Sequence, residues 1–307
     1  MAKIAWIFPG QGSQTVGMGI DLNNIPAAKT KFEIAEKILG WSVLEICQGD
    51  EATLSRTLYT QPCLYVIESI LSQLLAEKIG LPQLVTGHSL GEYVALFVAG
   101  VFDFESGLRL VKKRAELMDA AAGGKMAALM KFDRQQLEKV IAQTSDVVLA
   151  NDNSLAQVVI SGTPEAVETA LAQVKAKRAV VLNVSGAFHS PLMESASEQF
   201  QRELASVSFE NAKIPVLSNV EPTPTTDAEQ LQQRLIKQMT GSVRWREIMR
   251  QLPEEEITEA IEVGPGKVLT GLIKRTCSNI KLHNIGSVKE LNALVDSVNS
   301  QKLPVSQ

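Results

Sequence analysis

The run G-H-S-L-G at residues 87–91 follows the apolar stretch 84–86 and precedes a helical pattern of apolar residues at 90–98. A strand, then G-x-S-x-G, then a helix is typical of a sharp turn that carries a serine at its tip. Such a turn lifts the hydroxyl clear of the sheet and leaves the next backbone N–H free to stabilise an oxyanion. An ordinary glycine-rich turn between strand and helix has the same letters, so the pentapeptide is weak evidence by itself. Its context favours a nucleophile at Ser89.

Apolar runs alternate with helical patterns along most of the chain, which predicts an α/β fold with a parallel sheet. The pattern changes between 125 and 188, where we expect the order βαββαβ of the ferredoxin-like motif. Its expected strands lie at 126–131, 147–150, 158–160 and 180–184, and its expected helices at 133–143 and 164–176. We therefore predict a large α/β domain of residues 1–124 and 189–307, with an inserted ferredoxin-like subdomain at 125–188. The tail after residue 302 is expected to be frayed.

Composition narrows the class of protein. The chain has 307 residues, 45% of them hydrophobic and 21% charged, as expected of a soluble enzyme. Its net charge of -4 argues against nucleic acid as the main partner, and no apolar run has the roughly 18 residues of a membrane span. Three scattered cysteines form neither a metal motif nor a disulfide framework, which indicates a reducing, cytoplasmic compartment.

A serine nucleophile needs a base, and the chain has only three histidines. His88 adjoins the serine, but neighbours on a tight turn usually point apart. His283 lies in a late strand, where a structural role is expected. His189 lies between a strand and a helix start, at the edge where open α/β folds place their sites, so it is the best candidate. No acid stands in an obvious place to orient it, but a backbone carbonyl can hold the imidazole equally well.

Two further features surround this pair. The loop 9–14, P-G-Q-G-S-Q, ends the first strand and can supply a second oxyanion donor, although a plain turn or a phosphate loop are alternatives. Arg114 is flanked at helical spacing by apolar residues, so its guanidinium needs an anion. That anion is either a carboxylate of the chain, such as Glu92 or Glu262, or an anionic substrate.

With these residues in view, the chain resembles the malonyl-CoA:acyl carrier protein transacylases, which are related to polyketide acyltransferase domains. The resemblance covers almost the whole length. It rests on F-P-G-Q-G-S-Q at 8–14, T-Q-P at 60–62, G-H-S-L-G-E at 87–92, Arg114 with Met118, G-K-M-A-A at 124–128, Q-V-V-I-S-G at 157–162, A-F-H-S at 187–190 and E-V-G-P-G-K-V-L at 262–269.

The resemblance implies a hydrolase-like core with a ferredoxin-like insert. It also implies a role for each of several site residues. Ser89 would be the nucleophile and His189 its base. The other implied catalytic groups are the backbone N–H groups of Gln11 and Leu90, as oxyanion donors, and the main-chain carbonyl of Gln238, which would orient the histidine. Arg114 would bind the malonyl carboxylate, and the remaining implied substrate-binding residues are Gln61, Met118, Asn153 and Phe188. Phe188 and Leu90 match the malonyl pattern rather than the methylmalonyl one.

The implied reaction is ping-pong, through a malonyl-serine that passes to the phosphopantetheine thiol of acyl carrier protein. The expected partners are malonyl-CoA and the carrier protein, with no metal and no cofactor of the chain's own, and the chain is expected to be a monomer. A serine acyl-thioester hydrolase, a discrete acyltransferase of a polyketide synthase and a catalytically silent docking module are the rival interpretations.

Overall fold

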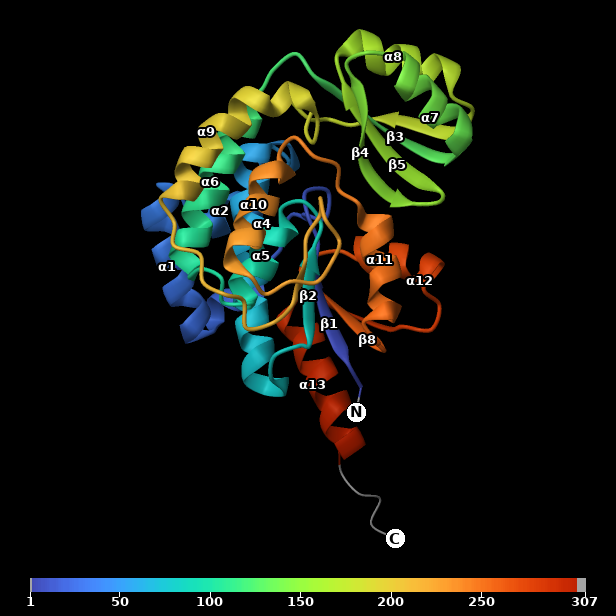
Figure 1. Ribbon diagram of the computed structural model, residues 1–307. Helices are drawn as coiled ribbons and strands as arrows, with labels where there is room; N and C mark the ends of the chain where they lie inside the picture. Colours follow the sequence, from blue (N-terminus) through green and yellow to red (C-terminus); the bar gives the residue numbers. More distant parts are fainter. Residues whose placement is uncertain (1, 303–307) are drawn as a thin grey trace.

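The computed structural model describes residues 2–302, which form two separate sheets (Figure 1). The larger sheet has the strand order β7-β2-β1-β8-β9 with parallel neighbours throughout, and the smaller is antiparallel with the order β4-β5-β3-β6. The strands are β1 (Ile4–Phe8), β2 (Leu84–Gly87), β3 (Lys125–Phe132), β4 (Val147–Ser154), β5 (Gln157–Gly162), β6 (Ala176–Val181), β7 (Val216–Leu217), β8 (Glu259–Val263) and β9 (Lys281–Ile285).

Helices cover both faces of the larger sheet and one face of the smaller one. They are η1 (Ile20–Asn24), α1 (Pro26–Leu39), α2 (Val43–Gln48), α3 (Glu51–Leu54), α4 (Thr57–Ile79), α5 (Gly91–Val98), α6 (Phe104–Ala120), α7 (Arg134–Gln143), α8 (Pro164–Gln173), η2 (Pro191–Met193), α9 (Glu194–Ala205), α10 (Ala228–Gln238), α11 (Trp245–Glu254), α12 (Val268–Thr276) and α13 (Val288–Lys302). No helix within residues 2–302 is long and apolar enough to cross a membrane.

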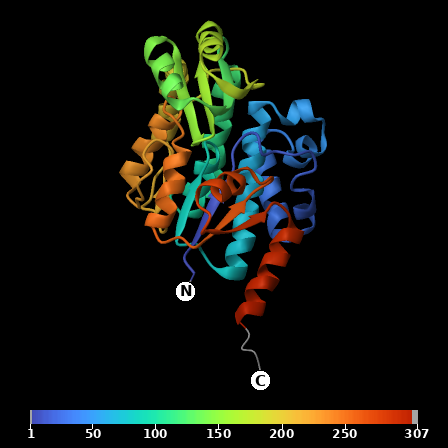
Figure 2. The same cartoon turned by 90° about the vertical axis from the view of Figure 1, so that its right-hand side faces the viewer.

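The central strand β1 shows why the sheet takes helices on both sides. Successive side chains of a strand point to opposite faces. Trp6 and Phe8 belong to the core that contains the apolar residues of α4, α5 and α6, whereas Ala5 and Ile7 belong to the core formed with α11 and α12. Figure 2 shows this layering, with α1 and α4 on one side of the sheet and α11 on the other. The apolar run is therefore buried on both faces from Ala5 to Phe8.

The smaller sheet lies beyond the carboxyl ends of the parallel strands (Figure 1). On one face, Leu129 and Ile160 pack against α7 and α8 in a core of their own. On the other face, Ala128 and Val159 join the main core and line a cavity. The two sheets thus enclose a cleft at the edge where the first parallel strands end.

The element boundaries differ from the sequence-based expectation in several places: β4 continues to Ser154 rather than residue 150, and α8 ends at Gln173 rather than residue 176. The last strand of the small sheet is β6 at Ala176–Val181, earlier than the expected 180–184. It is an edge strand with exposed polar residues, so it lacks the apolar pattern, and the apolar residues after it leave the sheet to line cavities. The short helices α2 and α3 were not predicted. The prediction for residues 303–307 lies outside the described residues.

Candidate active site

The turn from β2 into α5 carries Ser89 in the left-handed region, with φ of 52°. A side chain on either flanking glycine would not fit: a Cβ on Gly87 would lie 2.0 Å from the backbone carbon of Gly91, and a Cβ on Gly91 would lie 2.1 Å from the carbonyl oxygen of Phe8. The His88 N–H donates to the Phe8 carbonyl at 2.9 Å, which ties the turn to β1. Strain at the serine is held by these close backbone contacts.

The structure brings His189 to this turn across 100 residues of sequence. Its Nε2 lies 2.8 Å from the Ser89 Oγ. Its Nδ1 lies 2.9 Å from the carbonyl oxygen of Gln238 and 3.2 Å from that of Gly241. Both carbonyls can only accept, so Nδ1 carries the proton and Nε2 is left to accept the proton of the serine hydroxyl.

Burial and, secondly, the positive charge of Arg114 lower the pKa of His189 from 6.5 to about 3. The imidazole is therefore neutral at physiological pH, as a base must be before it takes a proton. Burial also lowers the pKa of His88, whose Nε2 lies 2.8 Å from the Asn153 Oδ1, away from the reacting oxygen.

Arg114 of α6 reaches the same oxygen. Its guanidinium is fully buried and donates to the Ser89 Oγ at 3.0 Å, to the Gln61 Oε1 at 2.7 Å and to the Gln238 Oε1 at 3.1 Å. Across the described chain it forms no ion pair with a carboxylate. A buried cation with only neutral partners is a strong receptor for an anion.

Neither carboxylate proposed as a structural partner for this arginine pairs with it. Glu262 accepts hydrogen bonds from the backbone N–H groups of Leu269 and Thr270, at the start of α12. Glu92 accepts from the Gln238 side chain and so lies one amide away from the guanidinium.

A cavity of about 90 Å³ collects most of the expected site residues. The backbone N–H groups of Gln11 and Leu90 donate no hydrogen bond to another backbone group in the described part of the chain, so both are free to bind an oxyanion. The predicted site residues that line this cavity are Gln11, Gln61, Ser89, Leu90, Arg114, Met118, Phe188 and His189. Gln238 does not line the cavity, but its carbonyl contacts the His189 Nδ1.

A second cavity, of about 300 Å³, adjoins the first and shares Gln11 and His88 with it. Asn153 lines this second cavity and not the first. Gly10, Ala128 and Arg178 also line it, between the first loop and the small sheet.

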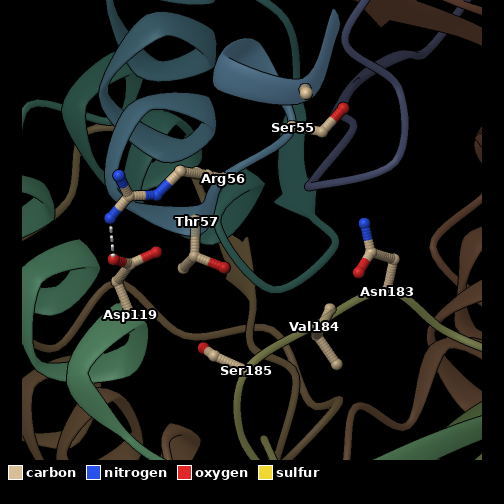
Figure 3. A pocket seen from close by; sticks show the side chains of 8 residues that line it. Ser55, Arg56, Thr57, Asp119, Asn183, Val184 and Ser185 are labelled. Carbon is tan, nitrogen blue, oxygen red and sulfur yellow. Dashed lines mark hydrogen bonds and ion pairs between the residues drawn. The ribbon is translucent and has the colours of Figure 1, made fainter.

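A third cavity, of about 360 Å³, lies on the other side of Val184 (Figure 3). Its charged side chains, Arg56 and Asp119, pair with each other at 2.7 Å. Thr57, which also lines it, accepts a hydrogen bond from the Gln11 side chain at 3.1 Å. None of the predicted site residues lines this cavity, so its link to the site is the hydrogen bond between Thr57 and Gln11.

Sequence reasoning missed Asn219. Its Oδ1 accepts from the Ser89 N–H at 2.7 Å and its Nδ2 donates to the Gly87 carbonyl at 2.6 Å, so one amide clamps both sides of the turn. No motif marks this residue, because its use depends on the strand β7 that precedes it. Glu92, by contrast, is part of the G-H-S-L-G-E run at 87–92, so the sequence motif itself pointed to this residue.

Within residues 2–302, no group of three or more His, Cys, Asp or Glu side chains is arranged to hold a metal ion. The described groups of the site are instead a hydroxyl, an imidazole, a guanidinium and backbone donors. This is the equipment of acyl chemistry at a serine.

The chain belongs to the acyl transferase family: the sequence profile of the acyl transferase domain matches residues 5–296. Among its relatives is the malonyl CoA-acyl carrier protein transacylase of Synechocystis sp., 60% identical over 95% of this chain and 100% of the relative. The resemblance drawn from the sequence motifs is therefore confirmed, and the chain is an acyltransferase.

Solved structures agree with this assignment. The crystal structure of the Synechocystis malonyl-CoA:ACP transacylase matches with a TM-score of 0.94 and 60% identity, covering 95% of this chain and 99% of that one. A malonyl-transacylase in complex with a type II polyketide acyl carrier protein matches with a TM-score of 0.91 and 34% identity, covering 96% of this chain and 100% of that one. An α/β architecture with separate parallel and antiparallel sheets is thus common to these proteins.

Proposed function

We propose that this chain transfers a malonyl group from malonyl-CoA to the phosphopantetheine thiol of an acyl carrier protein, in fatty acid biosynthesis. The observation that carries the proposal is the Ser89 Oγ, held between the His189 Nε2 and a buried arginine that has no acidic partner among residues 2–302. Similarity to malonyl transacylases over nearly the full length supports it.

In the first half-reaction, the Ser89 Oγ attacks the thioester carbonyl of malonyl-CoA while its proton passes to the His189 Nε2. The N–H groups of Gln11 and Leu90 bind the oxyanion of the tetrahedral intermediate. The C–S bond then breaks, and the CoA sulfur leaves with the proton from His189. Arg114 holds the free carboxylate, which aligns the ester and keeps water out of line.

In the second half-reaction, the phosphopantetheine thiol of the carrier protein takes the place of CoA. His189 removes the thiol proton, the sulfur attacks the malonyl-serine carbonyl, and the Ser89 Oγ leaves as it regains a proton. The Gln238 carbonyl keeps Nδ1 protonated throughout both halves. The steps as written require no metal ion and no bound cofactor.

We further propose the domain division and setting given by the sequence. Residues 1–124 and 189–307 would form a hydrolase-like domain, and residues 125–188 an inserted ferredoxin-like subdomain. The element order β3-α7-β4-β5-α8-β6 with strand order β4-β5-β3-β6 supports the second label. We also propose that the chain is a cytoplasmic monomer; its three cysteines are free, as expected in a reducing compartment.

The test is incubation with malonyl-CoA, with and without holo acyl carrier protein, followed by intact-mass detection of the protein. We expect a malonyl adduct that disappears when carrier is added, and no adduct on Ser89→Ala. An unchanged adduct on that variant would refute the nucleophile. Free malonate released as fast as transfer would identify a thioester hydrolase, and acceptance of polyketide carriers alone would identify a polyketide enzyme.

A further inference from the structure

Glu92 is a buried carboxylate beside the site that touches none of the reacting atoms. It lies in the first turn of α5 and is fully buried. Its Oε2 accepts from the Asn219 N–H at 3.1 Å and from the Gln238 Nε2 at 2.7 Å, whereas its Oε1 has no hydrogen-bond partner within the described residues. Burying a carboxylate is costly, so its presence here calls for a reason.

The Gln238 side chain joins this carboxylate to the site. Its Nε2 donates both protons, one to the Glu92 Oε2 and one to the Ser89 carbonyl at 2.9 Å. Because a carboxylate and a carbonyl can only accept, the amide nitrogen must face them. The Oε1 of the same amide therefore faces Arg114, from which it accepts at 3.1 Å.

Charge leads to the same pair of residues. The other groups around the Arg114 guanidinium are neutral: Gln61, the Ser89 hydroxyl, and the ring of Tyr93 at 5.3 Å from its Cζ. The Arg114 Nε has no hydrogen-bond partner in the described chain. Glu92 thus lies one amide away from a buried cation, without occupying the guanidinium edge that a substrate carboxylate needs.

We propose that Glu92 is a positioning residue for the choice of malonyl substrates. Acting through the Gln238 amide, it holds Arg114 in the place and orientation in which the guanidinium receives the substrate carboxylate. This inference rests on the proposed malonyl transfer. It adds Glu92 as the residue that makes the Arg114 guanidinium selective for a substrate carboxylate. The Gln238 amide also donates to the Ser89 carbonyl, so the same side chain fixes Arg114 relative to the turn that carries Ser89.

The experiment compares kcat/KM for acylation by malonyl-CoA and by acetyl-CoA, since acetyl lacks the carboxylate. Glu92→Leu removes the acceptor, and we expect its malonyl-to-acetyl preference to fall about tenfold, with acetyl affected less than about threefold. Glu92→Gln keeps an oxygen for both donors and should retain the preference within about threefold. Equal losses for both donors in Glu92→Leu would overturn the proposal.

A double-mutant cycle tests whether Glu92 acts through the arginine. On an Arg114→Ala background, Glu92→Leu should change the preference less than about twofold, because the group it positions is gone. A second tenfold fall there would show independent effects and would overturn the proposal. Gln238→Met deletes the connecting amide but keeps the main-chain carbonyl, so it should lower the preference as Glu92→Leu does; an unaltered preference would count against the relay.

A matched control comes from Glu68 of α4, a second fully buried carboxylate whose oxygens have no hydrogen-bond partner among the described residues. Glu68→Leu should leave the malonyl-to-acetyl preference at the parent value, and a comparable fall would mean that any buried carboxylate has this effect.

The proposed function and the inference about Glu92 can be refuted independently of each other. A parent that does not transfer malonyl refutes the function, whereas an active parent with an additive cycle refutes only the inference about Glu92.

Discussion

The oxygen of Ser89 lies between a base and a cation. The His189 Nε2 is 2.8 Å away and an Arg114 nitrogen 3.0 Å away. The cation favours a negative charge on the serine oxygen, but it also lowers the pKa of the histidine. Under the proposed function, a substrate carboxylate that pairs with Arg114 would offset that second effect and make His189 a stronger base.

We expect Arg114→Ala to lower kcat/KM for malonyl-CoA by about two orders of magnitude, since losing one partner of a buried charge pair costs about 3 kcal/mol. Acetyl-CoA should lose much less, so the variant should discriminate poorly between the two donors. Arg109 of the same helix is exposed and lies 3.6 Å from Glu105, so Arg109→Ala is the matched control and should behave as the parent. Undiminished discrimination in Arg114→Ala would remove this residue from substrate selection.

The same variant makes a pH prediction. A neutral imidazole is the active form, so activity is lost as the pH falls through the pKa of His189. In the parent that pKa is about 3, lowered first by burial and then by Arg114. Removing the cation raises the pKa, so the acid limb of kcat/KM for acetyl-CoA should move to higher pH in Arg114→Ala. A limb at the parent's pH would show that the cation does not act on the base.

At the scale of elements, the turn between β2 and α5 depends on glycine at both ends. The Cβ of any other residue would meet the backbone of β1 or of the turn itself. Backbone atoms cannot rotate away as side chains do, so the strand and the helix would have to separate.

We expect Gly91→Ala to lower the free energy of unfolding by about 3 kcal/mol and to abolish the acyl adduct, because its Cβ would lie 2.1 Å from the Phe8 carbonyl oxygen. The control is Gly271→Ala in α12, where a Cβ has nothing closer than 3.9 Å. That change should raise stability by up to about 1 kcal/mol, since alanine favours helix. Urea unfolding measures both, and equal effects of the two changes would contradict the steric argument.

At the scale of the whole molecule, one carboxylate ties the small sheet to the large one. Asp152 of β4 accepts from Arg134 of α7 at 2.8 Å and from Arg246 of α11 at 2.8 Å. The backbone of the same segment pairs with Val243, two residues before α11. The small sheet is therefore held against the segment 238–246, which includes the two carbonyls that contact His189.

Asp152→Asn should lower the free energy of unfolding by about 1–3 kcal/mol, because two partly buried guanidinium groups lose their anion. Hydrogen exchange in β3 to β6 should rise more than in β1 and β2. Glu168→Gln breaks only the Lys125 pair, in which the Glu168 side chain is 65% exposed, and should change stability by less than about 0.5 kcal/mol. A uniform rise in exchange across both sheets would argue against a local tie.

The sequence by itself determined the local features: the buried strand at 4–8, the turn around Ser89, the apolar face that carries Arg114, and the element order of the small sheet. These follow from periodicity and from residues such as glycine, whose effects act within a few positions. The bounds of the edge strand β6 and the existence of α2 and α3 were not predicted. Exposed polar residues hide the pattern of β6, and the two helices are too short for a helical period to appear.

Only the tertiary structure decided which distant groups meet. The pairing of Ser89 with His189, the Asn219 clamp and the Glu92–Gln238–Arg114 chain all join residues 25 or more positions apart. Such contacts depend on how parallel strands are ordered and on which loops their carboxyl ends bring together. That order is set by packing of the whole core, and no local pattern of residues encodes it.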